Sequence, residues 1–266
     1  MVFQSPGPIL CQLGPLTVRW YGVMIAAGFM LTVFAAVKMC KARGLDGDKL
    51  INLSLICFIA GVLGARLYYA ALNPSYFLLH PGEILATWKG GLSIHGGLIG
   101  GIIAAYIYLK KEKLPILAYA DILFASIPLA QAVGRWGNFF NSEAFGHPVG
   151  DDFFLKLFIP VDSRPMEFRT FSYFHPTFLY ESIWNLGLFL LLYFGIAPKA
   201  RKYPGMTSCA YLAGYSLGRV LIEPLRVDSI ANYMNIPIPL LVSAGTMGVA
   251  LCVMLRIYLK NVGNTN

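Results

Sequence analysis

Charged residues are scarce in this sequence of 266 residues. Only 13% are Asp, Glu, Lys or Arg, whereas 57% are hydrophobic. Soluble globular chains carry roughly 45–50% apolar and about 25% charged residues. A soluble chain this apolar would expose a large hydrophobic surface to water. The composition therefore excludes a soluble enzyme, a disordered regulator and a nucleic-acid-binding protein, and leaves a polytopic membrane protein.

Metal-ligand patterns are also lacking. The four histidines and five cysteines show no spacing typical of metal ligands or redox pairs. We therefore expect no metal site, no cofactor and no disulfide framework. The N-terminal segment has no basic region and contains Pro6, Pro8 and Pro15. We expect the first apolar run to be a retained span rather than a cleaved signal peptide.

Long apolar runs, by contrast, are abundant. A helix needs about 20 predominantly apolar residues to cross the hydrocarbon core of a membrane. Seven runs qualify: Trp20–Val37, Leu50–Leu72, Leu92–Leu109, Leu114–Trp136, Thr177–Ala197, Gly205–Ile222 and Ile238–Leu259. They predict an all-α polytopic membrane protein with seven transmembrane helices. Six or eight spans are the alternatives to this count.

Lys and Arg are distributed unevenly between the two sides of these spans. Twelve lie on one side: Lys38, Lys41, Arg43, Lys49, Lys110, Lys111, Lys113, Lys199, Arg201, Lys202, Arg256 and Lys260. Six lie on the other: Arg19, Lys89, Lys156, Arg164, Arg169 and Arg226. Cytoplasmic loops carry an excess of Lys and Arg, so we predict the N-terminus outside and the C-terminus inside. The net charge of +8 is then mostly a consequence of topology.

The longest segment between predicted spans covers residues 138–175 and is rich in phenylalanine. We predict a single integral membrane domain over residues 1–266, with this segment inserted between spans four and five as a small outer head. Its aromatic rings would pack on one another or at the membrane interface. No internal repeat is visible, and an odd number of spans argues against the inverted repeats of many secondary transporters.

Ionisable residues inside a bilayer are costly and are functional candidates by default. Five predicted spans carry such groups in their outer halves: Arg66, His95, Arg135, Glu181, Arg219, Glu223 and Arg226. The inner half holds little beyond Asp121. We expect the outer groups to face one another across a polar cavity open to the outer leaflet. Snorkelling or structural ion pairs are the alternative for Arg66, Glu223 and Arg226.

Arginine is the most informative of these residue types. Its planar guanidinium grips a phosphate through two hydrogen bonds and stays charged at any accessible pH. We interpret Arg135 and Arg219 as lacking a matching local acid, which favours an anionic ligand such as a phospholipid headgroup. Two other classes stay open. A lipid or anion transporter would use the same cavity but needs further polar groups toward the inner side, and an intramembrane protease needs a motif that is missing.

Residues 134–146 read GRWGNFFNSEAFG and resemble the signature motif of prolipoprotein diacylglyceryl transferases, with Arg135, Asn138, Asn141, Glu143 and Gly146 in register. Supporting segments follow in order: RWYG (19–22), GARLYY (64–69), SIHGGLIGG (93–101), HPTFLYES (175–182) and GYSLGRVLIEPLRVD (214–228). The resemblance covers nearly the whole chain and implies a seven-helix membrane bundle with a small periplasmic head. Phe178 departs from the polar residue, such as Gln, of some members.

The resemblance implies a multi-pass enzyme of the bacterial cytoplasmic (inner) membrane whose active site faces the outer leaflet. Such enzymes transfer a diacylglyceryl group from phosphatidylglycerol to the lipobox cysteine thiol of a preprolipoprotein signal peptide. The products are a thioether and glycerol phosphate, and the reaction begins lipoprotein maturation. The site residues that it implies are Tyr21, His95, Arg135, Asn138, Glu143, Gly146, Glu181, Tyr215, Arg219, Glu223 and Arg226.

The chemistry of thiol alkylation suggests a role for some of these residues. A thiolate is the nucleophile, so a base or a positive field must raise the thiolate fraction. We expect Arg135 and Arg219 to bind the phosphate and His95 to act as the base, with Glu223 next in line. Alternatively, His95 is a structural histidine at the membrane interface whose ring is fully hydrogen-bonded and which has no role in catalysis. We expect His175 to be a structural cap of span five, and His80 and His147 to be surface residues.

Overall fold

The computed structural model of the chain describes residues 1–14, 16–87, 90–227, 232–233 and 236–263. The chain divides into two compact units. The first unit comprises Met1–Ala35 and Ala120–Asn266, and the second comprises Ala36–Tyr119. Helix α1 (Trp20–Ala42) begins in the first unit and ends in the second, and α5 (Ile116–Asn141) begins in the second and ends in the first.

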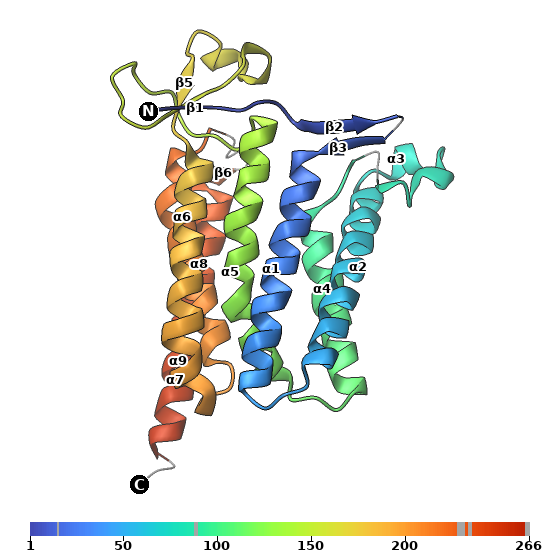
Figure 1. Cartoon of the computed structure of the whole chain (residues 1–266), viewed down its shortest axis with the longest axis vertical. Coiled ribbons are helices and arrows are strands. Elements are labelled where there is room, and N and C mark those ends of the chain that lie inside the picture. The colour runs from blue at the N-terminus through green and yellow to red at the C-terminus, as the bar shows by residue number, and fades with distance from the viewer. Residues whose placement is uncertain (15, 88–89, 228–231, 234–235, 264–266) are drawn as a thin grey trace. The chain divides into compact units, whose positions relative to one another are not determined.

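The second unit is built on a pair of long helices, α2 (Gly47–Leu72) and α4 (Ile94–Lys111), which lie side by side (Figure 1). Between them come two short helices, α3 (Pro74–Phe77) and η1 (Pro81–Glu83). The carboxylate of Asp46 starts α2, because it accepts hydrogen bonds from the backbone N–H groups of Asp48 at 2.9 Å and Lys49 at 3.0 Å.

Glycines let α2 and α4 approach each other closely. A Cβ atom on Gly64 would lie 2.5 Å from the carbonyl oxygen of Gly96, and one on Gly100 would lie 2.5 Å from that of Ala60. No side chain fits at these distances. Small residues at helix contacts are the usual means of close packing inside membranes, where water provides no hydrophobic driving force.

The first unit contains a bundle of helices. Besides α5 it has α6 (Thr177–Leu190), α8 (Met206–Ile222) and α9 (Ile238–Gly263). The chain continues after α6 through η5 (Leu191–Ile196), α7 (Ala197–Lys199) and η6 (Ala200–Lys202), and after α8 through η7 (Glu223–Leu225). Helix α8 packs against both α6 and α9 (Figure 1).

Asp121 holds the start of α8. Its carboxylate accepts hydrogen bonds from the backbone N–H groups of Gly205 and Ser208, each at 2.8 Å, and from Oγ of Ser208 at 2.7 Å. The first N–H groups of a helix have no partner within the helix, so an acid supplied by another helix stabilises this end. The acid that the sequence places in the inner half therefore has a structural role.

A small sheet joins the N-terminus to the segment between α5 and α6. Its order is β1 (Val2–Gln4), β4 (Lys156–Phe158), β5 (Tyr173–Phe174), with Val2 opposite Lys156 in parallel and Leu157 opposite Phe174 in antiparallel pairing. Short helices η3 (Val161–Ser163) and η4 (Met166–Phe168) lie between β4 and β5. Two hairpins complete the strands: β2 (Ile9–Leu13) with β3 (Leu16–Arg19), and β6 (Asn232–Tyr233) with β7 (Ile236–Pro237).

An apolar core fills the space between this sheet and the ends of α5 and α6. Its buried members are Phe139, Phe145, Leu157, Ile159, Phe174 and Phe178. The ring centroid of Phe178 lies 4.8 Å from that of Phe139 and 5.4 Å from that of Trp136. Phe178 departs from the polar residue that the resemblance suggests for some members. Its side chain is 1% exposed here, so a phenylalanine suits this position.

Five helical stretches among the described residues are long and apolar enough to cross a membrane. They are Trp20–Ala42, Gly47–Leu72, Ile116–Asn141, Thr177–Lys202 and Ile238–Asn261. The third and sixth predicted spans coincide largely with the shorter helices α4 and α8, of 18 and 17 residues. The chain is a mostly helical, polytopic membrane protein, and the count of seven spans and their direction stay predictions.

Candidate active site

Three arginines and two glutamates of the first unit form a continuous network of ion pairs. Nη2 of Arg135 lies 2.5 Å from Oε2 of Glu181, and Nη1 of Arg219 lies 3.2 Å from the same oxygen. Nη1 of Arg226 donates to the other carboxylate oxygen, Oε1, at 2.8 Å. Arg219 also pairs with Glu223. We call these five residues the arginine cluster. Its members come from α5, α6 and α8 and from the segment that follows α8.

The acids of the arginine cluster correct one sequence interpretation. Arg135 and Arg219 do not lack an acid, because both pair with Glu181, which is 3% exposed. A carboxylate buried this deeply is tolerated only when it is paired. When all five groups are ionised, three positive and two negative charges leave a net charge of +1. Guanidinium groups are suited to bind the oxygens of a phosphodiester.

Contacts between the helices set the register at which Glu181 meets its partners. A Cβ atom on Gly218 of α8 would lie 2.2 Å from Nε1 of Trp184 on α6, so the glycine makes room for the indole ring. On the side facing α5, Oγ of Ser182 donates to the carbonyl oxygen of Ala132 at 2.9 Å. Glu181 lies next to these contacts on α6 and reaches guanidinium groups on both neighbouring helices.

The motif at residues 134–146 folds back toward the arginine cluster. Nδ2 of Asn138 donates to Oε1 of Glu143 at 2.8 Å, and Nδ2 of Asn141 reaches the same oxygen at 3.3 Å. Nη1 of Arg135 lies 3.5 Å from Oδ1 of Asn138. Both asparagines lie in the last turn of α5, which ends at Asn141 and so continues beyond Trp136, the predicted end of the span. The motif thus connects Glu143 to Arg135 through Asn138.

Gly146 packs tightly between the start of α6 and the segment after α8. Its N–H donates to the carbonyl oxygen of His175 at 3.0 Å, and it forms an isolated antiparallel bridge with Arg226. A Cβ atom on Gly146 would lie 2.6 Å from Cβ of His175 and 2.7 Å from the carbonyl oxygen of Leu225. This position in the motif is therefore closed to any side chain, and the bridge ties the motif to Arg226.

The two predicted site tyrosines lie on α1 and α8. Tyr21 packs on Gly137, where a Cβ atom would lie 2.7 Å from Cδ2 of the ring. Tyr215 stacks on Tyr211, with 5.8 Å between ring centroids and 22° between ring planes. Tyr215 precedes Arg219 by four residues on α8, so it occupies the same face about one turn away.

Two side-chain amides one helical turn from the arginine cluster were not among the predicted site residues. Gln131 precedes Arg135 by four residues on α5, and Asn185 follows Glu181 by four residues on α6. Nε2 of Gln131 donates to Oη of Tyr211 at 2.9 Å. Because residues four apart share a helix face, a search for polar residues at this spacing within the apolar spans would have found both amides.

His95 is the predicted site residue that belongs to the second unit. It is the second residue of α4, is exposed, and has its ring centroid 6.3 Å from that of Tyr68. The N–H of Ser93, just before α4, donates to the carbonyl oxygen of Ala65 at 3.0 Å, which anchors the start of the helix on α2. The role of base for His95 stays a prediction.

His175 is structural in a different way from the one predicted. Pro176 takes the N-cap position of α6, and no side chain caps the helix there. Nδ1 of His175 instead lies 3.2 Å from Oη of Tyr180. Burial, together with the nearby His147, lowers the pKa of His175 below its ordinary value. His80 and His147 are exposed, and no group of three or more potential metal ligands occurs among the described residues.

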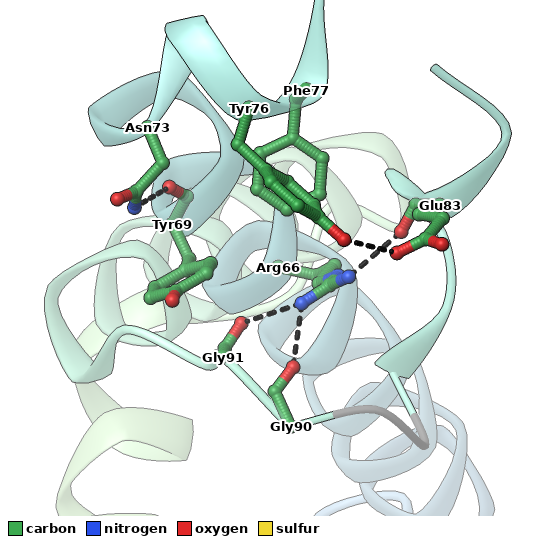
Figure 2. Close-up of a pocket in the computed structure, with 8 residues that line it drawn as sticks. All are labelled: Arg66, Tyr69, Asn73, Tyr76, Phe77, Glu83, Gly90 and Gly91. Atoms are coloured by element: carbon green, nitrogen blue, oxygen red, sulfur yellow. Dashed lines mark hydrogen bonds between the residues drawn. The ribbon is translucent and has the colours of Figure 1, made fainter. Parts of the chain in front are cut away.

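Backbone carbonyl groups hold Arg66 of α2 (Figure 2), and none of these hydrogen-bond acceptors among the described residues is a carboxylate. It is 3% exposed, and backbone carbonyl oxygens accept its N–H groups: Nε donates to Ile84 at 2.9 Å, Nη2 to Glu83 at 2.7 Å and Nη1 to Gly90 at 2.5 Å. Its guanidinium carbon lies 5.1 Å from the ring centroid of Phe77. A cavity of about 440 Å³ adjoins these groups. Arg66 therefore organises the segment between α2 and α4.

The chain matches the family model described as prolipoprotein diacylglyceryl transferase over residues 8–258. Similar proteins named phosphatidylglycerol–prolipoprotein diacylglyceryl transferase occur in Synechococcus elongatus (45% identity over 232 residues, 86% of this chain and 80% of the relative) and Trichormus variabilis (46% over 233 residues, 86% and 82%). The relative from Synechocystis sp. is 42% identical over 254 residues, 91% of this chain and 89% of its own. The chain belongs to the prolipoprotein diacylglyceryl transferase family.

Proposed function

We propose that this chain transfers the diacylglyceryl group of phosphatidylglycerol to the cysteine thiol of a preprolipoprotein lipobox. Membership of the family and the names of the relatives support this reaction. The observation in the structure that carries it is the convergence of Arg135, Arg219 and Arg226 on Glu181 within one helical bundle. A cluster with one surplus positive charge is suited to a phosphodiester.

The arginines stabilise the leaving group. Sulfur attacks the saturated carbon of the lipid glycerol, the carbon–oxygen bond to phosphate breaks, and the bonding electrons stay on that oxygen. The phosphate gains negative charge as the bond breaks, so fixed guanidinium groups stabilise the transition state more than the ground state. Arg135 and Arg219 are the proposed phosphate ligands. Glu181 acts indirectly, because it holds both guanidinium groups in place.

The thiol must lose its proton before or during the attack. A neutral histidine is the usual general base near pH 7, and His95 is the proposed acceptor of that proton. Glu223 is the next candidate, although its carboxylate already pairs with Arg219. The other proposed substrate-binding residues around the arginines are Tyr21, Asn138, Glu143, Gly146 and Tyr215.

The proposed site lies in the bacterial cytoplasmic membrane and faces the outer leaflet. The family model and the bacterial relatives support a bacterial membrane enzyme, and five long apolar helices fit a multi-pass protein. Arg135 and Arg219, the proposed phosphate ligands, each lie near the end of their helix that the distribution of Lys and Arg assigns to the outside of the membrane. The outer leaflet would supply phosphatidylglycerol, and the lipobox cysteine would reach the same depth.

Reconstitution tests this function against the other two classes. Purified protein in vesicles is mixed with phosphatidylglycerol and a lipobox peptide, and the peptide is analysed by mass spectrometry. A diacylglyceryl thioether on cysteine with release of glycerol phosphate supports the transferase. Movement of lipid between leaflets without peptide modification would instead indicate a transporter, and cleavage of the peptide would indicate a protease.

The first prediction concerns the phosphate ligand Arg135. In that assay, Arg135→Ala should lower kcat/KM at least about 100-fold, because one charged donor to the developing negative charge is lost. Arg135→Lys should recover little, since an ammonium cannot bind in a planar, two-bonded fashion. Arg256→Lys is the matched control, because Arg256 is exposed on α9. Normal turnover of the alanine variant would remove Arg135 from the phosphate site.

A further inference from the structure

Two buried amide oxygens below the arginine cluster have no hydrogen-bond partner. Oε1 of Gln131 and Oδ1 of Asn185 are both enclosed, and neither has a partner among the residues that the structure describes. Asn185 is 2% exposed. Buried side-chain oxygens are paired in the large majority of cases, so these unpaired acceptors indicate that a donor is supplied from elsewhere.

The two oxygens are acceptors of fixed orientation. The amide nitrogen of Gln131 donates to Oη of Tyr211 at 2.9 Å, so its oxygen points the other way. Asn185 lies on the buried face of α6, which also carries Glu181 and Ser182. The Ser182 hydroxyl is bonded to α5 at Ala132, so α5 and α6 are in fixed register at this level.

Helix geometry places each amide one turn away from a member of the arginine cluster. Four residues correspond to about 6 Å of rise, and side chains four apart stack on one face. Gln131 therefore lies one turn below Arg135 on α5, and Asn185 lies one turn below Glu181 on α6. A three-carbon headgroup attached to a phosphate at the arginines spans about one helical turn.

We propose that Gln131 and Asn185 accept hydrogen bonds from the hydroxyl groups of the lipid headgroup, and so select a glycerol headgroup for the transferase. This inference rests on the proposed function, because the arginine cluster must first hold the phosphate. A glycerol headgroup offers two free hydroxyls to the two acceptors. The guanidinium groups of the cluster repel an ammonium headgroup at this position. An enzyme site built to bind a hydroxyl discriminates strongly against an analogue without it.

Donor lipids that differ only in headgroup hydroxyls test the proposal. Phosphatidylglycerol is compared with phosphatidylpropanol, whose headgroup has the same length and no hydroxyl, in the vesicle assay with the lipobox peptide. The wild-type protein should prefer phosphatidylglycerol by about tenfold or more in kcat/KM. Gln131→Leu and Asn185→Leu should each lower kcat/KM for phosphatidylglycerol about tenfold and leave that for phosphatidylpropanol nearly unchanged.

Each other outcome overturns the proposal. A wild-type protein that does not distinguish the two lipids contradicts it without any variant. Variants that slow both lipids equally indicate that the amides are structural or bind a fixed water. Ser182→Ala is the matched control on the same helix face and should keep the wild-type ratio. Gln131→Met and Asn185→Ala repeat the measurement with smaller disturbance of folding. Failure of the wild-type protein to modify the peptide with either lipid would instead contradict the proposed function.

Discussion

At the scale of single residues, Glu181 is the group on which the arginine cluster depends. Its two carboxylate oxygens meet guanidinium groups from α5, from α8 and from Arg226, and its side chain is 3% exposed. Three like charges this close repel one another unless an acid lies between them. Glu181 therefore positions the arginines for a ligand, and the surplus charge leaves them able to attract one.

Removal of that charge gives the second prediction. Glu181→Gln keeps the shape but leaves three arginines with one carboxylate, so the net charge of the cluster rises from +1 to +2. We expect a loss of about 3–5 kcal/mol in the free energy of unfolding, as for other broken buried ion pairs, and a lower Tm. Glu112→Gln is the control, because Glu112 pairs with Lys49 where both side chains are partly exposed, and it should cost at most about 1 kcal/mol. Equal Tm values for the two variants would contradict the role of Glu181.

The third prediction tests the proposed base. His95→Gln keeps hydrogen-bonding capacity but cannot take up a proton, so kcat should fall about 100-fold or more. The pH profile of kcat/KM is recorded for both proteins, because loss of a general base changes that profile as well as the rate. His80→Gln, which changes an exposed histidine outside the motifs, should match the wild type. A His95→Gln protein with normal rate and normal pH profile would move the role to another group, with Glu223 first.

At the scale of elements, the contact between α2 and α4 fixes the helix that carries His95. The backbones of the two helices approach each other directly. The space available for a side chain therefore differs sharply from one glycine to the next. A Cβ atom on Gly64 would meet the carbonyl oxygen of Gly96 at 2.5 Å, whereas one on Gly61 would meet that of Gly97 at 3.5 Å. The first distance requires the helices to move apart, and the second is an ordinary van der Waals contact.

These two glycines provide the fourth prediction. Gly64→Ala should lower the free energy of unfolding by about 1–3 kcal/mol, because the inserted methyl group strains rigid backbone. Gly61→Ala should be neutral or stabilising, since alanine favours the helix over glycine by up to about 1 kcal/mol and no clash opposes it. Thermal unfolding of the purified proteins in detergent measures both. A similar loss of stability in the two variants would contradict the close approach at Gly64.

The sequence predicted which helices carry the site but not how its charges are balanced. Apolar runs and the polar residues within them placed Arg135, Glu181 and Arg219 at similar depth, and the structure brings these three together. Pairing depends on contacts between helices, which a single sequence does not specify. Glu181 was therefore predicted as a site residue, but its pairing with both arginines was missed. Carbonyl groups carry no signature in the sequence, so the way that Arg66 is held could not be predicted. The same holds for β1, whose three residues pair with a strand about 150 residues away.

At the scale of the whole molecule, the exposed surfaces of the long helices are apolar. Phe34 on α1, Ile102 on α4 and Val249 on α9 are each more than half exposed. Only 6% of the most apolar stretch of α9 is buried within the protein. Side chains of this kind are stable on the outside of a bundle only against lipid. The direction of the chain through that lipid then decides which leaflet and which substrates reach the arginine cluster.

The fifth prediction concerns that direction. Asp162 in η3 and Arg201 in η6 are both exposed, and a single predicted span separates them, so they should lie on opposite sides of the membrane. In a variant whose five native cysteines are replaced, Asp162→Cys should react with a membrane-impermeant maleimide added to intact bacterial cells. Arg201→Cys should react only after the membrane is permeabilised, because its neighbours are mostly cationic and such loops stay in the cytoplasm. Reaction of Arg201→Cys in intact cells would reverse the topology and place the arginine cluster toward the cytoplasmic leaflet. Reaction of both cysteines from outside would remove the fifth span and with it the count of seven.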